Sequence, residues 1–128
     1  MSDIKWLPIE AVLAIHARQL AEHGGGTGVR DTGLLDSALQ RPQNKVAYET
    51  PDLAGLAAAY AFGIARNHPF VDGNKRTALV VSRTFLLING YQITAPKEDR
   101  LKKFLALAEG SLTEVALAEW FRNCLLKV

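Results

Sequence analysis

The chain has 128 residues, of which 48% are hydrophobic, and its 15 basic and 13 acidic residues give a formal net charge of +2. This length and apolar content are typical of a single folded domain, here spanning residues 1–128, and they exclude an intrinsically disordered protein. The nearly balanced charge does not predict direct binding to nucleic acid or to an anionic membrane.

Several features of the sequence predict a cytoplasmic protein. Cys124 is the only cysteine, so no intrachain disulfide can form, as is typical of proteins in reducing compartments. The first twenty residues carry acidic side chains within their apolar pattern and lack a small-residue cleavage site, so no signal peptide is expected. The apolar run from 78 to 88 is interrupted by polar residues and is too short to span a bilayer.

Two helices are predicted in the first third of the chain. Apolar residues with a period near 3.6 predict a helix that begins at Pro8 and ends at the glycine-rich segment 23–28. Asp31 is the expected N-cap of a short second helix that ends before Pro42. Residues 43–49 show no clear period, and they are predicted to form a loop.

A third and a fourth helix are predicted on either side of the polar loop 68–73. Thr50 is the expected N-cap of the third helix, which ends near Asn67. The fourth helix is expected to begin near Asn74. Between residues 77 and 88 its apolar side chains lie on nearly every side, which is typical of the buried central helix of a bundle.

Two further helices are predicted in the last third of the chain. One runs from about Pro96 to Glu109, and the other is expected to be capped at Ser111, with Glu114 completing a capping box. Residues 91–94 are expected to form at most a short strand. Because helical signals dominate throughout, the predicted fold is all-α, a compact bundle around the helix that follows loop 68–73.

The stretch HPFVDGNKRT, residues 68–77, places several groups that bind phosphate at the start of one helix. The first N–H groups of a helix lack intrahelical partners and bind anions, and Gly73 would let a phosphate approach the backbone closely. Lys75 and Arg76 are electrostatically unfavourable in the first turn of a bare helix. A bound polyphosphate would reverse that penalty, so the pattern predicts a polyphosphate site.

Two other residues of this stretch could supply a metal ligand and a base. Asp72 suits Mg²⁺, which typically binds one or two protein carboxylates together with phosphate oxygens, and His68 could accept a proton from a hydroxyl. Phe70 is expected to anchor the loop in the core. Taken singly, Asp72 or Asn74 could be an ordinary N-cap, His68 a loop residue, and the two cations solvated surface charge. Their joint occurrence at one helix start favours phosphoryl or nucleotidyl transfer.

Residues 68–76 resemble the H-x-F-x-[DE]-[GA]-N-[GK]-R motif of the Fic/Doc superfamily and match it at every specified position. Three more stretches, residues 25–43, 56–67 and 85–91, resemble the death-on-curing (Doc) toxins of bacterial toxin–antitoxin modules. The resemblance implies an all-α Fic-type bundle that binds ATP and Mg²⁺ and modifies a protein hydroxyl.

The resemblance also implies a role for each matching residue. His68 would be the catalytic base that acts on the target hydroxyl, and Asp72 would bind the metal. The segment 42–50 would correspond to the flap that docks the target chain. The residues that would hold the phosphates are Gly73, Asn74, Lys75 and Arg76.

Two positions bear on which group is transferred. Fic adenylyltransferases typically have Gly where this chain has Lys75, and a second Arg where it has Leu79. Doc toxins share the Lys and lack the second Arg, and they resemble kinases that phosphorylate a Thr of elongation factor Tu and arrest translation. The resemblance therefore implies a Ser/Thr kinase that transfers the ATP γ-phosphate. An AMP-transferring Fic protein and a catalytically silent binding module are the alternatives.

The sequence lacks the self-inhibitory [ST]-x-x-x-E-[GN] motif of many Fic proteins, because Leu105 stands four residues before Glu109. The resemblance therefore implies a separate antitoxin that covers the active-site cleft. Such a partner would contribute a Phd-like disordered segment that folds onto the helices near the site.

Overall fold

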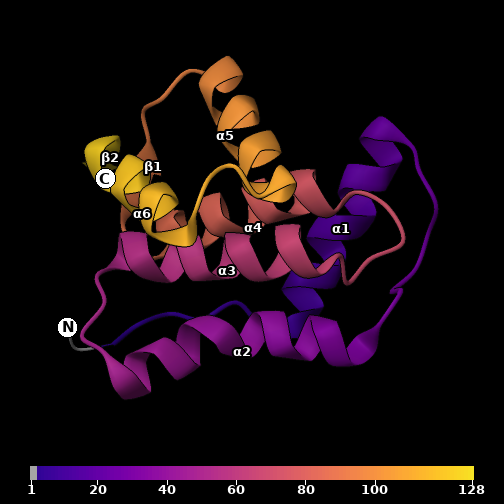
Figure 1. Ribbon diagram of the computed structural model, residues 1–128, viewed down its shortest axis with the longest axis horizontal. Helices are drawn as coiled ribbons and strands as arrows, with labels where there is room; N and C mark the ends of the chain where they lie inside the picture. The colour runs from indigo at the N-terminus through magenta and orange to yellow at the C-terminus, as the bar shows by residue number, and fades with distance from the viewer. Residues whose placement is uncertain (1–2) are drawn as a thin grey trace.

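In residues 3–128, which the computed structural model describes, six helices and two short strands follow one another along the chain (Figure 1). The predicted all-α fold is confirmed, because the two strands form only a small ribbon beside the helices. In chain order, the elements are α1 (Ile9–His23), α2 (Thr32–Tyr48), α3 (Leu53–Asn67), α4 (Asn74–Ile88), β1 (Tyr91–Ile93), α5 (Lys97–Glu109), α6 (Glu114–Asn123) and β2 (Leu125–Lys127).

Helix α3 lies at the centre of the bundle, between α2 on one side and α5 and α6 on the other (Figure 1). Eleven of its fifteen residues are buried, and most of these are alanine or glycine. Such small side chains let neighbouring helices approach closely. At Gly63, for example, an added Cβ would lie only 2.9 Å from the Cα of Ala38 on α2.

Helix α4 packs against α1, α3, α5 and β1, as expected for a helix within the bundle. It is nevertheless not apolar on every buried side, because Leu87 and Ile88 near its end are exposed and Ser82 is buried. Seven of its fifteen residues are buried, fewer than the eleven of α3, so α4 shares the centre of the bundle with α3. The alanine-rich composition of α3 is the physical reason for its greater burial.

Helix α2 begins where the sequence predicts but does not end there. Asp31 is its N-cap, since the Asp31 carboxylate accepts a hydrogen bond of 3.0 Å from the N–H of Leu34. The helix then continues through the buried Pro42 to Tyr48, so the predicted stop before Pro42 and the predicted loop at 43–49 are wrong. Proline removes one helical hydrogen bond. The helix packs along α3 and also makes side-chain contacts with α6.

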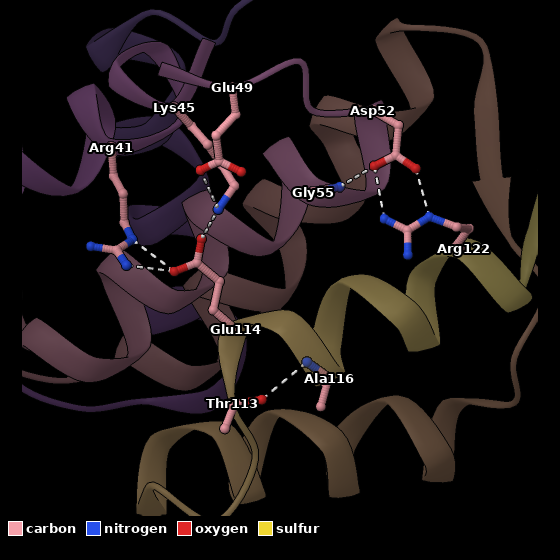
Figure 2. Close-up of polar contacts among 9 residues, drawn as sticks. All are labelled: Arg41, Lys45, Glu49, Asp52, Gly55, Thr113, Glu114, Ala116 and Arg122. Carbon is pink, nitrogen blue, oxygen red and sulfur yellow. Dashed lines mark hydrogen bonds and ion pairs between the residues drawn. The ribbon is translucent and has the colours of Figure 1, made fainter. Parts of the chain in front are cut away.

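Those contacts centre on Glu114, the first residue of α6 (Figure 2). The Glu114 carboxylate accepts hydrogen bonds of 3.0 Å from the Nε of Arg41 and from the Nζ of Lys45, which lie on either side of Pro42. Glu114 is therefore not part of the predicted capping box with Ser111. The N-cap of α6 is Thr113, whose hydroxyl accepts from the N–H of Ala116 at 3.0 Å (Figure 2).

The start of α3 also differs from the prediction, because its N-cap is Asp52 rather than Thr50. The Asp52 carboxylate accepts from the N–H of Gly55 at 2.9 Å. It also accepts two hydrogen bonds from Arg122 on α6, of 2.6 Å from Nε and 3.0 Å from Nη2 (Figure 2). One carboxylate thus caps α3 and ties it to the end of α6.

This arrangement predicts a small pH dependence of stability. The hydrogen bond from Arg122 is the largest cause that holds the pKa of Asp52 below its ordinary value of 3.8. A lowered pKa in the folded state stabilises the fold above about pH 4, and this contribution is lost as the pH falls through the lowered value. Because Asp52 and Arg122 are both about half exposed, the pair contributes less than about 1 kcal/mol.

Asp52→Asn keeps a good N-cap and removes only the charge. We expect it to lower the free energy of unfolding by less than about 1 kcal/mol at pH 7, and by progressively less towards pH 3. Urea denaturation of both proteins at the two pH values measures the difference. The same loss at pH 3 and at pH 7 would contradict the role of the charge.

The remaining elements follow the sequence closely. Helix α1 ends at the glycine-rich segment and α5 begins after Pro96, both as predicted. The short strand expected near residues 91–94 is confirmed as β1, and it pairs antiparallel with β2, which is not predicted. None of the helices within residues 3–128 has the length and hydropathy of a membrane-spanning segment.

Candidate active site

The polar loop between α3 and α4 is held by the glycine-rich segment between α1 and α2. An antiparallel bridge pairs Val29 with Phe70. On either side of this bridge, the N–H of Val71 donates to the carbonyl of Gly28 at 3.1 Å, and the N–H of Arg30 donates to a loop carbonyl at 2.7 Å. Two segments about forty residues apart in the chain are therefore joined by backbone hydrogen bonds at this end of the bundle.

Phe70 lies inside the hydrophobic core with no exposed surface. His16, a buried residue of α1, stacks on it with 3.8 Å between ring centroids and 9° between ring planes. Sequence reasoning missed His16 as part of this site. The available signal was its spacing of four residues from Val12, which places both side chains on the buried face of α1.

His68 is the C-cap of α3, and its imidazole is exposed to solvent. Its backbone is left-handed, with φ 50° and ψ 58°, and within residues 3–128 it is the one non-glycine residue with a positive φ. Arg30 holds this turn, because its Nε donates to the His68 carbonyl at 2.7 Å and its Nη2 to the Asn67 carbonyl at 2.9 Å. A cation at the end of α3 also complements the helix dipole.

Asp72 is exposed at the other end of the loop, and the glycine-rich segment contacts it closely. Its Oδ2 accepts a hydrogen bond of 2.6 Å from the N–H of Gly26. An added Cβ at Gly25 would lie 3.0 Å from the Asp72 Cβ, and one at Gly26 would lie 3.0 Å from Oδ2, so larger residues would displace the carboxylate. Among residues 3–128, Oδ1 of Asp72 has no hydrogen-bond partner.

Asn74, the first residue of α4, is buried and makes two hydrogen bonds with the loop. Its side-chain oxygen accepts from the N–H of Phe70 and its side-chain nitrogen donates to the Phe70 carbonyl, both at 3.0 Å. The side chain is thus engaged with the loop. What Asn74 can offer to an anion is its backbone N–H.

The first intrahelical hydrogen bond of α4 runs from the N–H of Thr77 to the carbonyl of Gly73, at 2.9 Å. The N–H groups of residues 74–76 precede that bond, at the positive end of the helix. Gly73 precedes them in a left-handed conformation, with φ 80°, that suits glycine. Lys75 and Arg76 are both exposed in this first turn.

A pocket of about 330 Å³ brings most of the predicted residues together. Residues 72–76 form one side of it, and Gln19, His23 and the following two glycines form the other. Backbone N–H groups and two cations match the oxygens of a polyphosphate, and the Oδ1 of Asp72 can ligate Mg²⁺. His68 is not among the lining residues and lies at the far end of the loop.

Comparison with known proteins agrees with the geometry of the pocket. The family model of the Fic/DOC family matches residues 6–86. The chain is 54% identical over 76 residues to Toxin Doc of Mycolicibacterium smegmatis, covering 56% of this chain and 57% of that protein, a little over half its length. It is 38% identical over 109 residues to Protein kinase doc of Escherichia phage P1, covering 84% of this chain and 86% of the relative.

A more distant similarity links the chain to Protein adenylyltransferase Fic of Drosophila melanogaster, with 36% identity over 89 residues. That match covers 66% of this chain but only 18% of the insect protein. The family match, in contrast, runs from before α1 into α4 and includes the whole polar loop. The resemblance of residues 68–76 to the superfamily motif is thereby confirmed, and the chain belongs to the Fic/DOC family.

Proposed function

We propose that this chain is a Doc-type toxin that acts as a protein kinase in the bacterial cytoplasm. It transfers the γ-phosphate of ATP to a Ser or Thr hydroxyl, with a Thr of elongation factor Tu as the expected target and arrest of translation as the result. The observation that carries the proposal is the pocket at the start of α4, where Asp72, Lys75 and Arg76 surround backbone N–H groups. The names of the mycobacterial and phage relatives, a toxin and a protein kinase, support it.

In this proposal, the N–H groups at the start of α4 and the side chains of Lys75 and Arg76 hold the phosphates of ATP. The Oδ1 of Asp72 ligates Mg²⁺, while Gly26 fixes the other carboxylate oxygen by its 2.6 Å hydrogen bond. When bound, ATP supplies the phosphoryl group, and Mg²⁺ neutralises charge on its phosphate oxygens. The chain itself contributes position and electrostatic complementarity.

His68 accepts the proton of the target hydroxyl as the hydroxyl oxygen attacks the γ-phosphorus, while the bond from that phosphorus to the bridging oxygen breaks and ADP leaves. Its imidazole is exposed, so it can meet a side chain presented by another protein. Arg30 keeps the backbone of His68 in one conformation through two hydrogen bonds to the end of α3. A fixed backbone limits the positions that the imidazole can reach, which favours a productive geometry.

AMP transfer is the second candidate, supported by the insect relative that is named an adenylyltransferase. Two residues favour γ-phosphate transfer instead. Lys75 is exposed at the rim of the pocket, where adenylyltransferases have Gly, and Leu79 is half-buried against the core, where they have a second Arg. A changed set of cations changes how a triphosphate lies, and so which phosphorus meets the hydroxyl.

The proposed antitoxin partner has a suitable surface beside the pocket. A second cavity, of about 360 Å³, adjoins it along α1, α4 and α5 and shares Arg76 and His23 with it. Arg83, Lys97 and Arg100 add positive charge to this cavity, which Leu79 and Leu101 also line, whereas Arg18 is paired with Glu22. An acidic and apolar Phd-like segment that folds on binding fits these properties and would cover the site.

The test uses purified protein, MgCl₂ and a bacterial translation extract. Parallel reactions contain ATP labelled at the γ- or the α-phosphate, each with His68→Ala protein as the control. Label from the γ-phosphate on a protein the size of elongation factor Tu is expected. Label from the α-phosphate would show an adenylyltransferase, and no label in an extract that contains the factor would favour another target or a silent binding module.

Lys75→Gly tests the choice between the two transfers. We expect this variant to lose γ-phosphate transfer by about tenfold or more, because a cation beside the pocket is removed from the phosphates. The same labelling reactions measure the change and show whether any α-label appears. A γ-transfer rate equal to that of the parent protein would contradict the role of Lys75 in selecting the transferred group.

A further inference from the structure

His16 links α1 to the loop that precedes α4. It is 4% exposed, stacks on Phe70 and lies with Nε2 2.8 Å from the carbonyl oxygen of Asp72. A carbonyl oxygen only accepts hydrogen bonds, so Nε2 must carry the proton. The same ring lies 3.7 Å from where a Cβ of Gly73 would be. One buried side chain therefore stacks on Phe70, binds the Asp72 carbonyl and lies close to Gly73.

The Asp72 carbonyl has a particular place in the geometry of α4. Helical hydrogen bonds join the N–H of one residue to the carbonyl four residues before it, so this carbonyl is the acceptor that Arg76 would use in a longer helix. The observed helix instead makes its first bond one residue later, from Thr77 to Gly73. The Asp72 carbonyl accepts from His16 instead, and the left-handed backbone of Gly73 turns it away from the N–H of Arg76.

The side chain of Asn74 likewise binds a second carbonyl of the loop. Its side-chain nitrogen donates to the carbonyl of Phe70, which is the acceptor that the N–H of Asn74 itself would use in a longer helix. Two loop carbonyls are therefore bound by side chains instead of by the backbone of α4. The oxygens of these two carbonyls are bound by side chains, while the N–H groups at the start of the helix have no intrahelical hydrogen bond.

We propose that His16 is a positioning residue for the phosphate site. By binding the Asp72 carbonyl it fixes the non-helical turn at Asp72 and Gly73, so that this carbonyl does not rotate towards α4 and the N–H of Arg76 stays available for a phosphate oxygen. It also fixes the backbone of Asp72, whose carboxylate is the metal ligand. This inference rests on the proposed function, because the phosphates of ATP are the anion for which the turn is shaped.

Three substitutions separate the hydrogen bond of His16 from its packing. His16→Phe keeps an aromatic ring against Phe70 but removes the Nε2–H donor. His16→Gln places an amide N–H close to the position of Nε2 and can restore the bond to Asp72. His16→Asn carries a similar amide that is too short to reach, and it replaces His16→Phe in both measurements below if circular dichroism shows that the latter does not fold.

The first measurement follows amide hydrogen exchange by NMR in the protein without nucleotide. In the parent protein and in His16→Gln, the amide of Arg76 is expected to exchange freely, while that of Thr77, bonded to Gly73, is protected. In His16→Phe the Asp72 carbonyl is left to Arg76, so its amide should exchange at least about tenfold more slowly. Thr77 serves as the internal reference because its acceptor does not change.

The second measurement compares the binding of ATP and of AMP, in MgCl₂, by calorimetry. His16→Phe is expected to weaken ATP binding about tenfold and AMP binding less than about twofold, because the turn acts on the outer phosphates. His16→Gln should stay within about threefold of the parent for both. A residue that only stabilised the fold would not produce this difference between the two nucleotides.

The outcomes are distinct. An Arg76 amide that exchanges equally in the parent and in His16→Phe would overturn the proposal. So would slower exchange together with unchanged ATP affinity, since His16 would then shape the helix start without serving the phosphate. If the parent protein does not bind ATP, the proposed function fails, and with it the anion for which His16 is said to position the turn, whereas a bound parent with unaffected variants contradicts His16 alone.

Discussion

Replacing His68 by alanine is expected to lower the rate of γ-phosphate transfer by about 100-fold or more and to leave the fold intact. The imidazole is exposed at the end of α3, and the hydrogen bonds of this residue are made by its backbone, which alanine retains. Loss of a general base slows the chemical step without removing a ligand of the nucleotide. Initial rates with γ-labelled ATP, together with thermal unfolding curves, measure both parts of the expectation.

Two controls make this result specific. His68→Asn tolerates the left-handed backbone as well as histidine does but cannot act as a base, so it should be as inactive as His68→Ala. ATP affinity should be the same in both variants and in the parent protein, because His68 does not line the phosphate pocket. A transfer rate within about threefold of the parent would show that another group accepts the proton.

Replacing Phe70 by alanine is expected to lower the free energy of unfolding by about 3–5 kcal/mol. The side chain has no exposed surface and belongs to the main hydrophobic cluster, and His16 stacks on its ring. Its removal would leave a cavity directly beneath the loop that carries the predicted site residues. Urea denaturation followed by circular dichroism measures the change.

Val71→Ala is the matched control for this prediction. Val71 is the next residue of the same loop but is 51% exposed, so its truncation should change the free energy of unfolding by no more than about 0.5 kcal/mol. Phe70→Leu, which keeps most of the buried volume, should lie between the two. A loss below about 1 kcal/mol for Phe70→Ala would mean that the loop collapses into the space, and that Phe70 does not anchor it.

The parts of the fold that could be predicted are those whose signals are local. Glycines after residue 23 end α1, Asp31 caps α2, and Pro96 precedes α5, as expected from short stretches of sequence. Helix α2 continues through Pro42, where it packs along α3 and where Arg41 and Lys45 bind Glu114, about seventy residues away; no local pattern reports such contacts.

The misplaced caps have a different cause. Before α3 and before α6, two residues capable of capping lie two positions apart, and composition cannot choose between them. The choice of Asp52 over Thr50 agrees with its additional bonds to Arg122 on a distant helix. For α6, the Glu114 carboxylate binds Arg41 and Lys45 and so does not form a capping box with Ser111, and the N-cap is Thr113.

The candidate site likewise has residues that could be predicted from a local pattern and residues that could not. Its motif residues are contiguous, so their joint chemistry could be read from ten residues of sequence. The groups that hold them come from elsewhere: His16 from α1, Gly26 from the glycine-rich segment and Arg30 from before α2. Their roles depend on the docking of that segment against the loop, and a lone histidine or arginine gives no sign of it.

On the proposed mechanism, the left-handed backbone at His68 makes one position a compromise between stability and activity. Such a conformation costs a residue with a side chain roughly 1–2 kcal/mol relative to glycine, and a glycine at the end of α3 would avoid that cost. The imidazole therefore occupies a position at which selection for stability alone would favour glycine. When the protein is expressed in bacterial cells, His68→Gly is accordingly expected to have a higher free energy of unfolding than the parent protein. On the proposed mechanism it is also expected to be less toxic to the cells.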